Sequence, residues 1–144
     1  MHDLKKTMMT VKVKINQTKL LSKNKHELKS ITYEMQTEQE QVVTKSTEIY
    51  NHGNAVTALL YNKEQRTIIL TEQFRMATYI NGNNTGILKE ACAGLIDGEE
   101  TPEQTVKREI KEELGYVIDK VQKVYEAYTS PGCLTEILTL YIAE

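Results

Sequence analysis

The stretch GLIDGEETPEQTVKREIKEELGY, residues 94–116, contains the best-defined element of this 144-residue chain. Thr101 is a good N-cap, Gln104 completes a capping box, and Pro102 takes the first helical position, where no N–H is needed. Apolar residues then recur at helical spacing as far as a glycine that suits a C-terminal cap. We therefore predict a helix from about Pro102 to Leu114.

This helix has an apolar face and an adjacent acidic face when its residues are placed at about 100° intervals. The apolar stripe is expected to pack on a sheet. The acidic stripe then lies at the edge of that contact, beside the loop of residues 93–100. The apolar stripe comprises Val106, Ile110 and Leu114, and the acidic stripe comprises Glu109, Glu112 and Glu113.

The acidic stripe and Glu100 gather four carboxylates beside the glycine at position 94. Most charge runs are solvated helix faces, and that interpretation stays open. However, Glu112 and Glu113 lie in the C-terminal half of the helix, where the helix dipole disfavours negative charge. Crowded carboxylates repel one another unless a hard divalent cation lies among them. We therefore predict a Mg2+ site, in which Mn2+ can substitute, and chemistry on a phosphate-bearing small molecule.

Composition limits the class of protein. A chain of this length, 40% hydrophobic and 26% charged, is expected to form one domain with a real core. A net charge of -2 argues against a nucleic-acid partner, and the lack of any long apolar run argues against a membrane partner. Cys92 and Cys133 lack metal-type spacing and, with no signal peptide, indicate reduced thiols in the cytoplasm. A disulfide between them stays open.

The N-terminal third shows weaker patterns. Residues 1–10 have no periodicity and are expected to be a disordered start. Within residues 11–50, segments at 11–15, 31–35 and 41–50 predict a small antiparallel sheet. Such a sheet has little core of its own, so we expect it to pack on a second subunit and make the protein a homodimer.

Residues 51–144 are expected to form the main domain. Strands are predicted at 55–61, at 67–71, at 73–75 continuing through 77–80, at 87–93, within 117–128 and at 134–143. A sheet of this kind usually needs a helix on each face, and one helix is evident. Because the chain stops at Glu144 straight after an apolar strand, we expect this domain to be truncated and its C-terminal covering helix to be missing.

Residues 94–116 resemble the Nudix box, the signature of hydrolases that split nucleoside diphosphates linked to another group. One position departs from the signature, Tyr116, where the family prefers an aliphatic residue. The resemblance implies an α/β fold, the Nudix α/β/α sandwich with a mixed sheet. The matching positions are Gly94, Glu100, Arg108, Glu109, Glu112, Glu113 and Gly115.

The resemblance extends over residues 11–144 and points to one branch of the family. Within the family the chain is most similar to the GDP-mannose pyrophosphatases. The neighbouring ADP-ribose pyrophosphatases usually carry a proline where this chain has Cys92. The motifs that carry this similarity are Gly53-Asn-Ala, Gln73-Phe-Arg75, Asn81-Gly-Asn, Glu90-Ala-Cys-Ala-Gly-Leu95 and Ser130-Pro-Gly-x-x-Thr-Glu136.

The resemblance implies a role for each residue of the metal site. Glu109 and Glu113 are expected to be direct Mg2+ ligands, together with the backbone carbonyl of Ala93. Glu112 is expected to bind a second metal ion or a metal-bound water. Two cations would neutralise the diphosphate and activate water. Arg108 is expected to hold Glu109 or Glu112 in place.

Substrate contacts are implied at five further positions. Arg75 is expected either to reach a phosphate or to form a surface salt bridge, and the two alternatives stay open. Glu136 follows a loop that lines the sugar-diphosphate site in relatives, and Glu48 matches a position in the nucleotide pocket. Gly94 and Leu95, in the glycine turn, complete the expected substrate-binding set.

The remaining candidate residues are expected to play supporting parts. Glu100 is structural or supports the metal ligands. Cys92 and Cys133 pack as small residues rather than act as nucleophiles. The histidines are scattered along the chain and are expected to be inert. His26 lies near the place where relatives put an aromatic residue against the base, so the base preference stays open.

The leading expectation is a Mg2+-dependent hydrolase that converts GDP-mannose to GMP and mannose 1-phosphate. Members of the family carry a further acidic residue on a loop after the last predicted strand, and this chain ends before it. Three alternatives therefore stay open. They are hydrolysis of ADP-ribose, a catalytically silent nucleotide-sugar binding module, and an acidic helix with a purely structural role.

Overall fold

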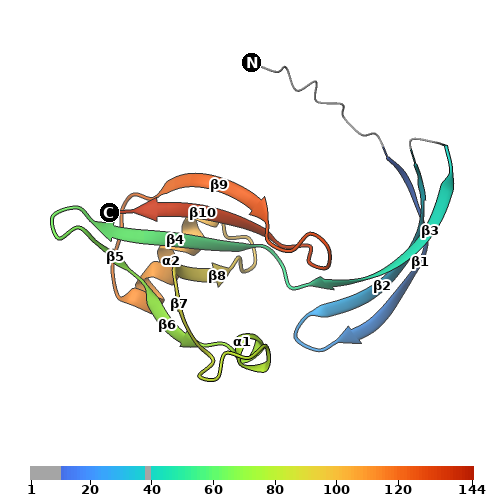
Figure 1. The fold of residues 1–144 in the computed structure, drawn as a ribbon. Helices are drawn as coiled ribbons and strands as arrows, with labels where there is room; N and C mark the ends of the chain where they lie inside the picture. Colours follow the sequence, from blue (N-terminus) through green and yellow to red (C-terminus); the bar gives the residue numbers. More distant parts are fainter. Residues whose placement is uncertain (1–10, 38–39) are drawn as a thin grey trace, which may run out of the picture. The chain divides into compact units, whose positions relative to one another are not determined.

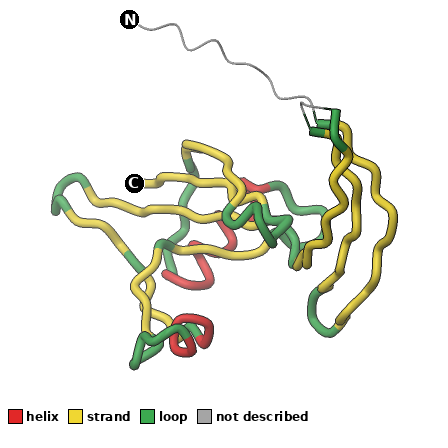
Figure 2. The backbone as a smooth tube through the Cα atoms, turned by 45° about the vertical axis from the view of Figure 1, so that its right-hand side comes forward, coloured by secondary structure: helices red, strands yellow, loops and turns green. Residues whose placement is uncertain are grey.

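The chain forms two compact units (Figure 1). The computed structural model describes residues 11–37 and 40–144, so the disordered start expected for residues 1–10 lies outside the described residues. The N-terminal unit contains the described residues up to His52 together with Gly132–Leu134, and the main unit contains Gly53–Pro131 and Thr135–Glu144. Strands make up most of the N-terminal unit, whereas the main unit combines strands with two helices and loops (Figure 2).

The N-terminal unit is an antiparallel sheet with the strand order β1-β2-β3, which confirms the predicted small sheet. β1 and β2 extend well beyond the predicted segments 11–15 and 31–35, because the backbone ladder continues through polar residues that show no apolar alternation. No described residue of the three strands is fully buried, so this sheet has no core of its own. The strands are β1 (Lys12–Lys23), β2 (Glu27–Gln36) and β3 (Val42–Asn51).

The main unit is built on a five-stranded sheet. Its strand order is β5-β4-β10-β9, and β8 pairs with β4. β4 and β10 run parallel whereas the other pairs are antiparallel, so the sheet is mixed as predicted. The strands are β4 (Ala55–Asn62), β5 (Thr67–Ile69), β8 (Cys92–Leu95), β9 (Gln122–Tyr128) and β10 (Ile137–Ala143).

Helix α2 (Pro102–Leu114) has the predicted ends. The Thr101 hydroxyl accepts a hydrogen bond from the Gln104 N–H at 3.3 Å, and the Gln104 side chain accepts one from the Thr101 N–H at 2.8 Å. Gly115 ends the helix in the left-handed conformation, with φ 75°. The capping box and the glycine therefore fix the helix boundaries by local contacts alone.

The core of the main unit lies between α2 and the sheet. Val106 and Ile110 on the apolar stripe are fully buried, and Val56 of β4 and Cys92 of β8 are buried with them. Leu114, the third residue of the stripe, packs on the edge of this cluster. The apolar stripe thus docks on the sheet as predicted, and α2 lies beside β8 (Figure 1). The acidic stripe reaches β8 through the hydrogen bond from the Ala93 N–H to Glu113.

A hairpin of β6 (Thr71–Phe74) and β7 (Ile87–Glu90) forms a separate two-stranded sheet. The predicted strand over 77–80 is wrong: α1 (Met76–Ile80) is a short helix, because the Thr78 hydroxyl and two backbone N–H groups bond the Arg75 carbonyl. The predicted single strand 87–93 is broken at Ala91, since β7 pairs with β6 and β8 pairs with β4. The strand predicted within 117–128 occupies Gln122–Tyr128, and the last strand begins at Ile137, later than the predicted Leu134.

Candidate active site

The glycine turn and the acidic stripe meet at Gly94. A Cβ atom placed on this glycine would lie 2.1 Å from both Cδ and Oε1 of Glu109. No real side chain tolerates such a contact, so glycine is the residue that lets the Glu109 carboxylate approach the backbone of β8. Gly94 and Glu109, which are separated in the sequence, therefore lie in direct contact in the fold.

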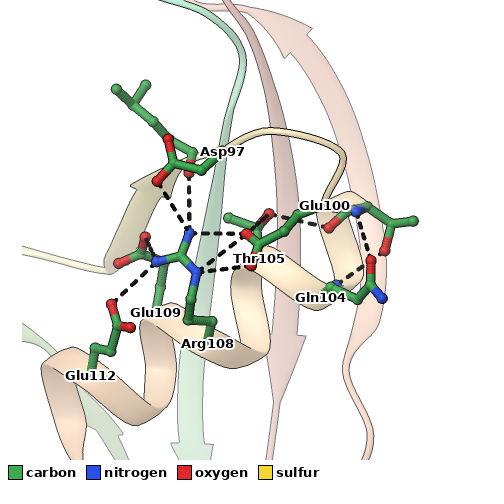
Figure 3. A network of polar contacts seen from close by, with 9 residues as sticks. Asp97, Glu100, Gln104, Thr105, Arg108, Glu109 and Glu112 are labelled. Atoms are coloured by element: carbon green, nitrogen blue, oxygen red, sulfur yellow. Dashed lines mark hydrogen bonds and ion pairs between the residues drawn. The ribbon is translucent and has the colours of Figure 1, made fainter.

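Arg108 lies at the centre of the acidic residues (Figure 3). Its Nη1 atom lies 2.7 Å from Oε1 of Glu109 and 3.2 Å from Oε2 of Glu112. Its Nη2 atom lies 3.1 Å from Oε2 of Glu100 and 3.4 Å from the carbonyl oxygen of Leu95. The planar guanidinium thus links the helix to the preceding loop by charge-assisted hydrogen bonds, including the contacts to Glu109 and Glu112 that the sequence analysis expected.

Glu100 is held by two side chains of α2. Arg108 and the Thr105 hydroxyl hydrogen-bond its carboxylate, and the guanidinium is the larger cause of a Glu100 pKa below its ordinary value. Thr105 is fully buried, and its hydroxyl also lies 3.2 Å from the Thr101 carbonyl. The sequence analysis missed Thr105. Its signal was a polar residue next to the apolar stripe and five positions after Glu100.

Glu113 is held by donors from two strands. Gln73 of β6 donates from Nε2 to Oε1 at 2.8 Å, and the backbone N–H of Ala93 donates to Oε2 at 3.3 Å. Burial raises the pKa of the Cys92 thiol to about 12, and its hydrogen bond with Glu113 contributes to the shift. Cys92 is therefore a protonated core residue, and both Cys92 and Cys133 are free thiols.

Glu109 is a carboxylate in an unfavourable setting. Its side chain is only 14% exposed. Burial raises the pKa of Glu109, and the neighbouring Glu112 and Glu113 raise it further, whereas Arg108 lowers it. A partly buried carboxylate beside two others is stabilised by added positive charge.

Family membership is decided by a sequence match over most of the chain. A family model described as the NUDIX domain matches residues 51–143. The chain belongs to the Nudix family. It is therefore a Nudix hydrolase, and the glycine turn, Arg108 and the acidic stripe of α2 are its Nudix box.

Curated relatives cover nearly the whole of this Nudix chain. GDP-mannose pyrophosphatase of Yersinia pestis (strain Pestoides F) is 49% identical over 136 residues, which are 94% of this chain and 68% of the relative. GDP-mannose pyrophosphatase of Cronobacter sakazakii (strain ATCC BAA-894) is 45% identical, over 94% of this chain and 71% of the relative. The chain thus spans about two thirds of the length of these proteins.

A solved structure shares the fold. The crystal structure of an ADP compounds hydrolase superposes with a TM-score of 0.72, covering 92% of this chain and 66% of that one. At 17% identity this likeness concerns the fold alone. It agrees with the predicted Nudix architecture. No helix within the described part of the chain has the length and apolar character needed to cross a membrane.

Nudix hydrolases generally use divalent metal ions, and the residues of this site fit such an ion. The side chains of the acidic stripe offer only carboxylate oxygens, which hard divalent cations prefer. Burial, with smaller contributions from Glu112 and Glu113, raises the pKa of Glu109 despite Arg108, so a nearby cation would favour its ionised form. Among the described residues, no three acidic, histidine or cysteine side chains converge on one point as ligands. The fit of this site to a divalent ion therefore rests on its carboxylate oxygens and on their negative charge.

The other expected substrate residues, Arg75, Glu136 and Glu48, lie outside the Nudix box in the sequence. Arg75 forms a two-point ion pair with Glu90, with Nε–Oε1 at 2.7 Å and Nη2–Oε2 at 3.2 Å. Glu136 accepts a hydrogen bond from the Thr129 hydroxyl. Glu48 is exposed on β3 in the N-terminal unit. The pKa of Arg75 is raised, first by its hydrogen bond with Glu90 and also by the charge of Glu113.

Two histidines are not scattered, which corrects the sequence analysis. The rings of His26, Tyr50 and His52 lie in the N-terminal unit with centroids 5.7–5.9 Å apart. The cause is strand register: Glu27 of β2 pairs with Asn51 of β3, so the residues flanking this pair meet at one end of the sheet. Sequence periodicity does not reveal register, and the cluster was missed for that reason.

The Glu100 contacts predict a pH-dependent contribution to stability. Because Arg108 and Thr105 hold the pKa of Glu100 below 4.5, its ionised form stabilises the fold above that pH, and the contribution is lost as the pH falls through the lowered value. Glu100→Gln is expected to destabilise the protein at pH 7 and to have progressively less effect as the pH falls below 4.5. Urea unfolding at several pH values measures this, with the exposed neighbour Glu99→Gln as control. A Glu100→Gln effect independent of pH would contradict it.

Proposed function

We propose that this Nudix hydrolase cleaves the diphosphate of a nucleotide sugar, with GDP-mannose converted to GMP and mannose 1-phosphate. The proposal rests on two observations together: the partly buried Glu109 lies against Gly94, and relatives at 45–49% identity are named GDP-mannose pyrophosphatase. The carboxylates gathered beside a backbone turn support a site for a cation. The relatives supply the class of substrate.

The residues of the Nudix box divide between holding the cation and holding one another. Glu109, Glu112 and Glu113, with the carbonyl of Ala93, would hold Mg2+, for which Mn2+ can substitute. When bound, the ion neutralises charge on the diphosphate and activates water. Arg108 keeps Glu109 and Glu112 oriented through its 2.7 Å and 3.2 Å contacts, and shields them from mutual repulsion.

We assign substrate binding to five residues: Arg75, Gly94, Leu95, Glu136 and Glu48. Arg75 uses two of its five N–H donors on Glu90, so others remain for a phosphate oxygen. Gly94 and Leu95 place backbone atoms beside the acidic stripe. Glu136 and Glu48 complete the proposed set on the sugar and nucleotide sides.

The proposal also includes a homodimer in the cytoplasm. The N-terminal sheet lacks a core, and Ile15 and Val42 are each 63% exposed, so a second copy would bury apolar surface that one chain leaves in water. Cytoplasmic location is supported by the two free thiols.

The direct test is turnover of defined substrates. The protein is incubated with GDP-mannose or ADP-ribose, with Mg2+ or with EDTA, and the products are separated and quantified by chromatography. We expect GMP and mannose 1-phosphate in equal amounts, only with Mg2+, and at a higher kcat/KM than for ADP-ribose. A higher kcat/KM for ADP-ribose would reverse the substrate assignment.

Absence of turnover separates the two non-catalytic alternatives. Mg2+ that raises Tm, together with binding of GDP-mannose but no products, would indicate a silent binding module. No effect of Mg2+ on Tm and no turnover would indicate that the acidic stripe is structural. Phosphate release after addition of a phosphatase, compared with release before it, confirms that the products are monoesters.

A further inference from the structure

The Gln73 side chain is aimed at the acidic stripe by the alternation of β6. Thr71 and Gln73 are partly buried, whereas Glu72 and Phe74, on the other face of the strand, are exposed. The Thr71 hydroxyl lies 3.2 Å from the Glu90 carbonyl oxygen, and Gln73 is paired with Leu88 across the hairpin. The pairing of β6 therefore places the Gln73 side chain on the partly buried face of the strand, the face that contacts α2.

The contact made by Gln73 is specific. Its Nε2 atom lies 2.8 Å from Oε1 of Glu113, 40 positions further along the chain. The amide nitrogen must face the carboxylate, because an ionised carboxylate only accepts hydrogen bonds. The other oxygen, Oε2, accepts from the Ala93 N–H at 3.3 Å. One donor on each oxygen fixes the plane of the carboxylate and leaves further lone pairs on both oxygens.

A neutral donor suits this position. Lysine or arginine at position 73 would form an ion pair with Glu113 and compete with a cation for its charge. A carboxylate there would repel Glu113. The nearby cation, Arg75, is instead engaged by Glu90 through two hydrogen bonds. Glu113 is thus oriented by dipoles, and its negative charge is not cancelled by a direct ion pair with Arg75.

We propose that Gln73 is a positioning residue for the hydrolytic site, holding the Glu113 carboxylate in the orientation that binds the divalent cation. The inference rests on the proposed function, because it takes Glu113 to be a metal ligand. It adds a residue that lies outside the Nudix box, on a strand that precedes the box by about 20 residues.

The test compares Gln73→Met with Gln122→Met. Methionine preserves side-chain length and removes the donor. Gln122 lies exposed on β9 and serves as the matched control. Calorimetric titration of the substrate-free proteins with Mg2+ gives Kd, and kinetics with GDP-mannose give kcat and KM. We expect Gln73→Met to raise the Kd for Mg2+ and lower kcat by about 10-fold or more, with KM changed less than twofold. The Gln122 variant is expected to match the wild type.

A purely structural role predicts a different result. It would lower Tm while leaving the Kd for Mg2+ and kcat unchanged, and that outcome would overturn the inference. Gln73→Asn is a second variant that keeps a polar amide but shortens it out of hydrogen-bond reach, and it should shift Kd in the same direction even if the methionine variant folds poorly.

Glu113→Gln separates failure of the inference from failure of the proposed function. If Glu113→Gln leaves the Kd for Mg2+ unchanged, then Glu113 is not a ligand and the proposed metal site is wrong. If Glu113→Gln weakens Mg2+ binding while both Gln73 variants bind Mg2+ normally, the metal site stands and only the role of Gln73 is rejected.

Discussion

Glu113→Gln is expected to reduce kcat for GDP-mannose by about a thousandfold. A divalent ion supplies several kcal/mol of transition-state stabilisation, and losing about 4 kcal/mol of it corresponds to about three orders of magnitude in rate. The fold should change little, because glutamine keeps the shape of the side chain. It retains one acceptor for Gln73 or the Ala93 N–H and leaves the other donor unsatisfied, at a cost of about 1–3 kcal/mol.

The measurement is steady-state kinetics at saturating Mg2+ together with thermal unfolding. Glu103→Gln provides the control on the same helix, since Glu103 is 59% exposed and contacts Lys107. The control should retain wild-type kinetics. Activity of Glu113→Gln within threefold of the wild type would remove the basis for assigning Glu113 to the metal.

Gly94→Ala is expected to lower kcat/KM by about 100-fold at a modest cost in stability. The added Cβ would lie 2.1 Å from Cδ and Oε1 of Glu109. These atoms are the far end of a flexible side chain, so the fold relieves the clash by moving the carboxylate rather than the backbone. Overpacking of this kind costs about 1–3 kcal/mol, whereas misplacement of a reacting group by about 1 Å costs about 100-fold in rate.

A double-mutant cycle with Glu109→Ala tests this mechanism. Removing the Glu109 carboxylate removes the clash, so Gly94→Ala should destabilise the Glu109→Ala background less than the wild type. Its effect on kcat/KM should also disappear in that background. Equal stability effects of Gly94→Ala in the two backgrounds would show that the glycine is required for another reason.

Local patterns account for the parts of the fold that the sequence analysis predicted well. The helix ends are set by the capping box of Thr101 and Gln104 and by the glycine after Leu114. Each acts within one turn of the helix, so the sequence alone predicts it. Long-range pairing accounts for the differences. The sequence of residues 87–93 gives no sign that β7 and β8 bond to different sheets, and residues 77–80 become helical through bonds to the Arg75 carbonyl.

The sequence by itself determined the Nudix box: a capped helix with an apolar stripe and an acidic stripe, preceded by a glycine turn. These features follow from a 3.6-residue period and from spacings within 23 residues. Only the tertiary structure decided the partners of each carboxylate. Gly94 admits Glu109, and Gln73 orients Glu113 from 40 positions away. Such contacts depend on strand pairing and register, because these bring distant side chains within hydrogen-bond distance.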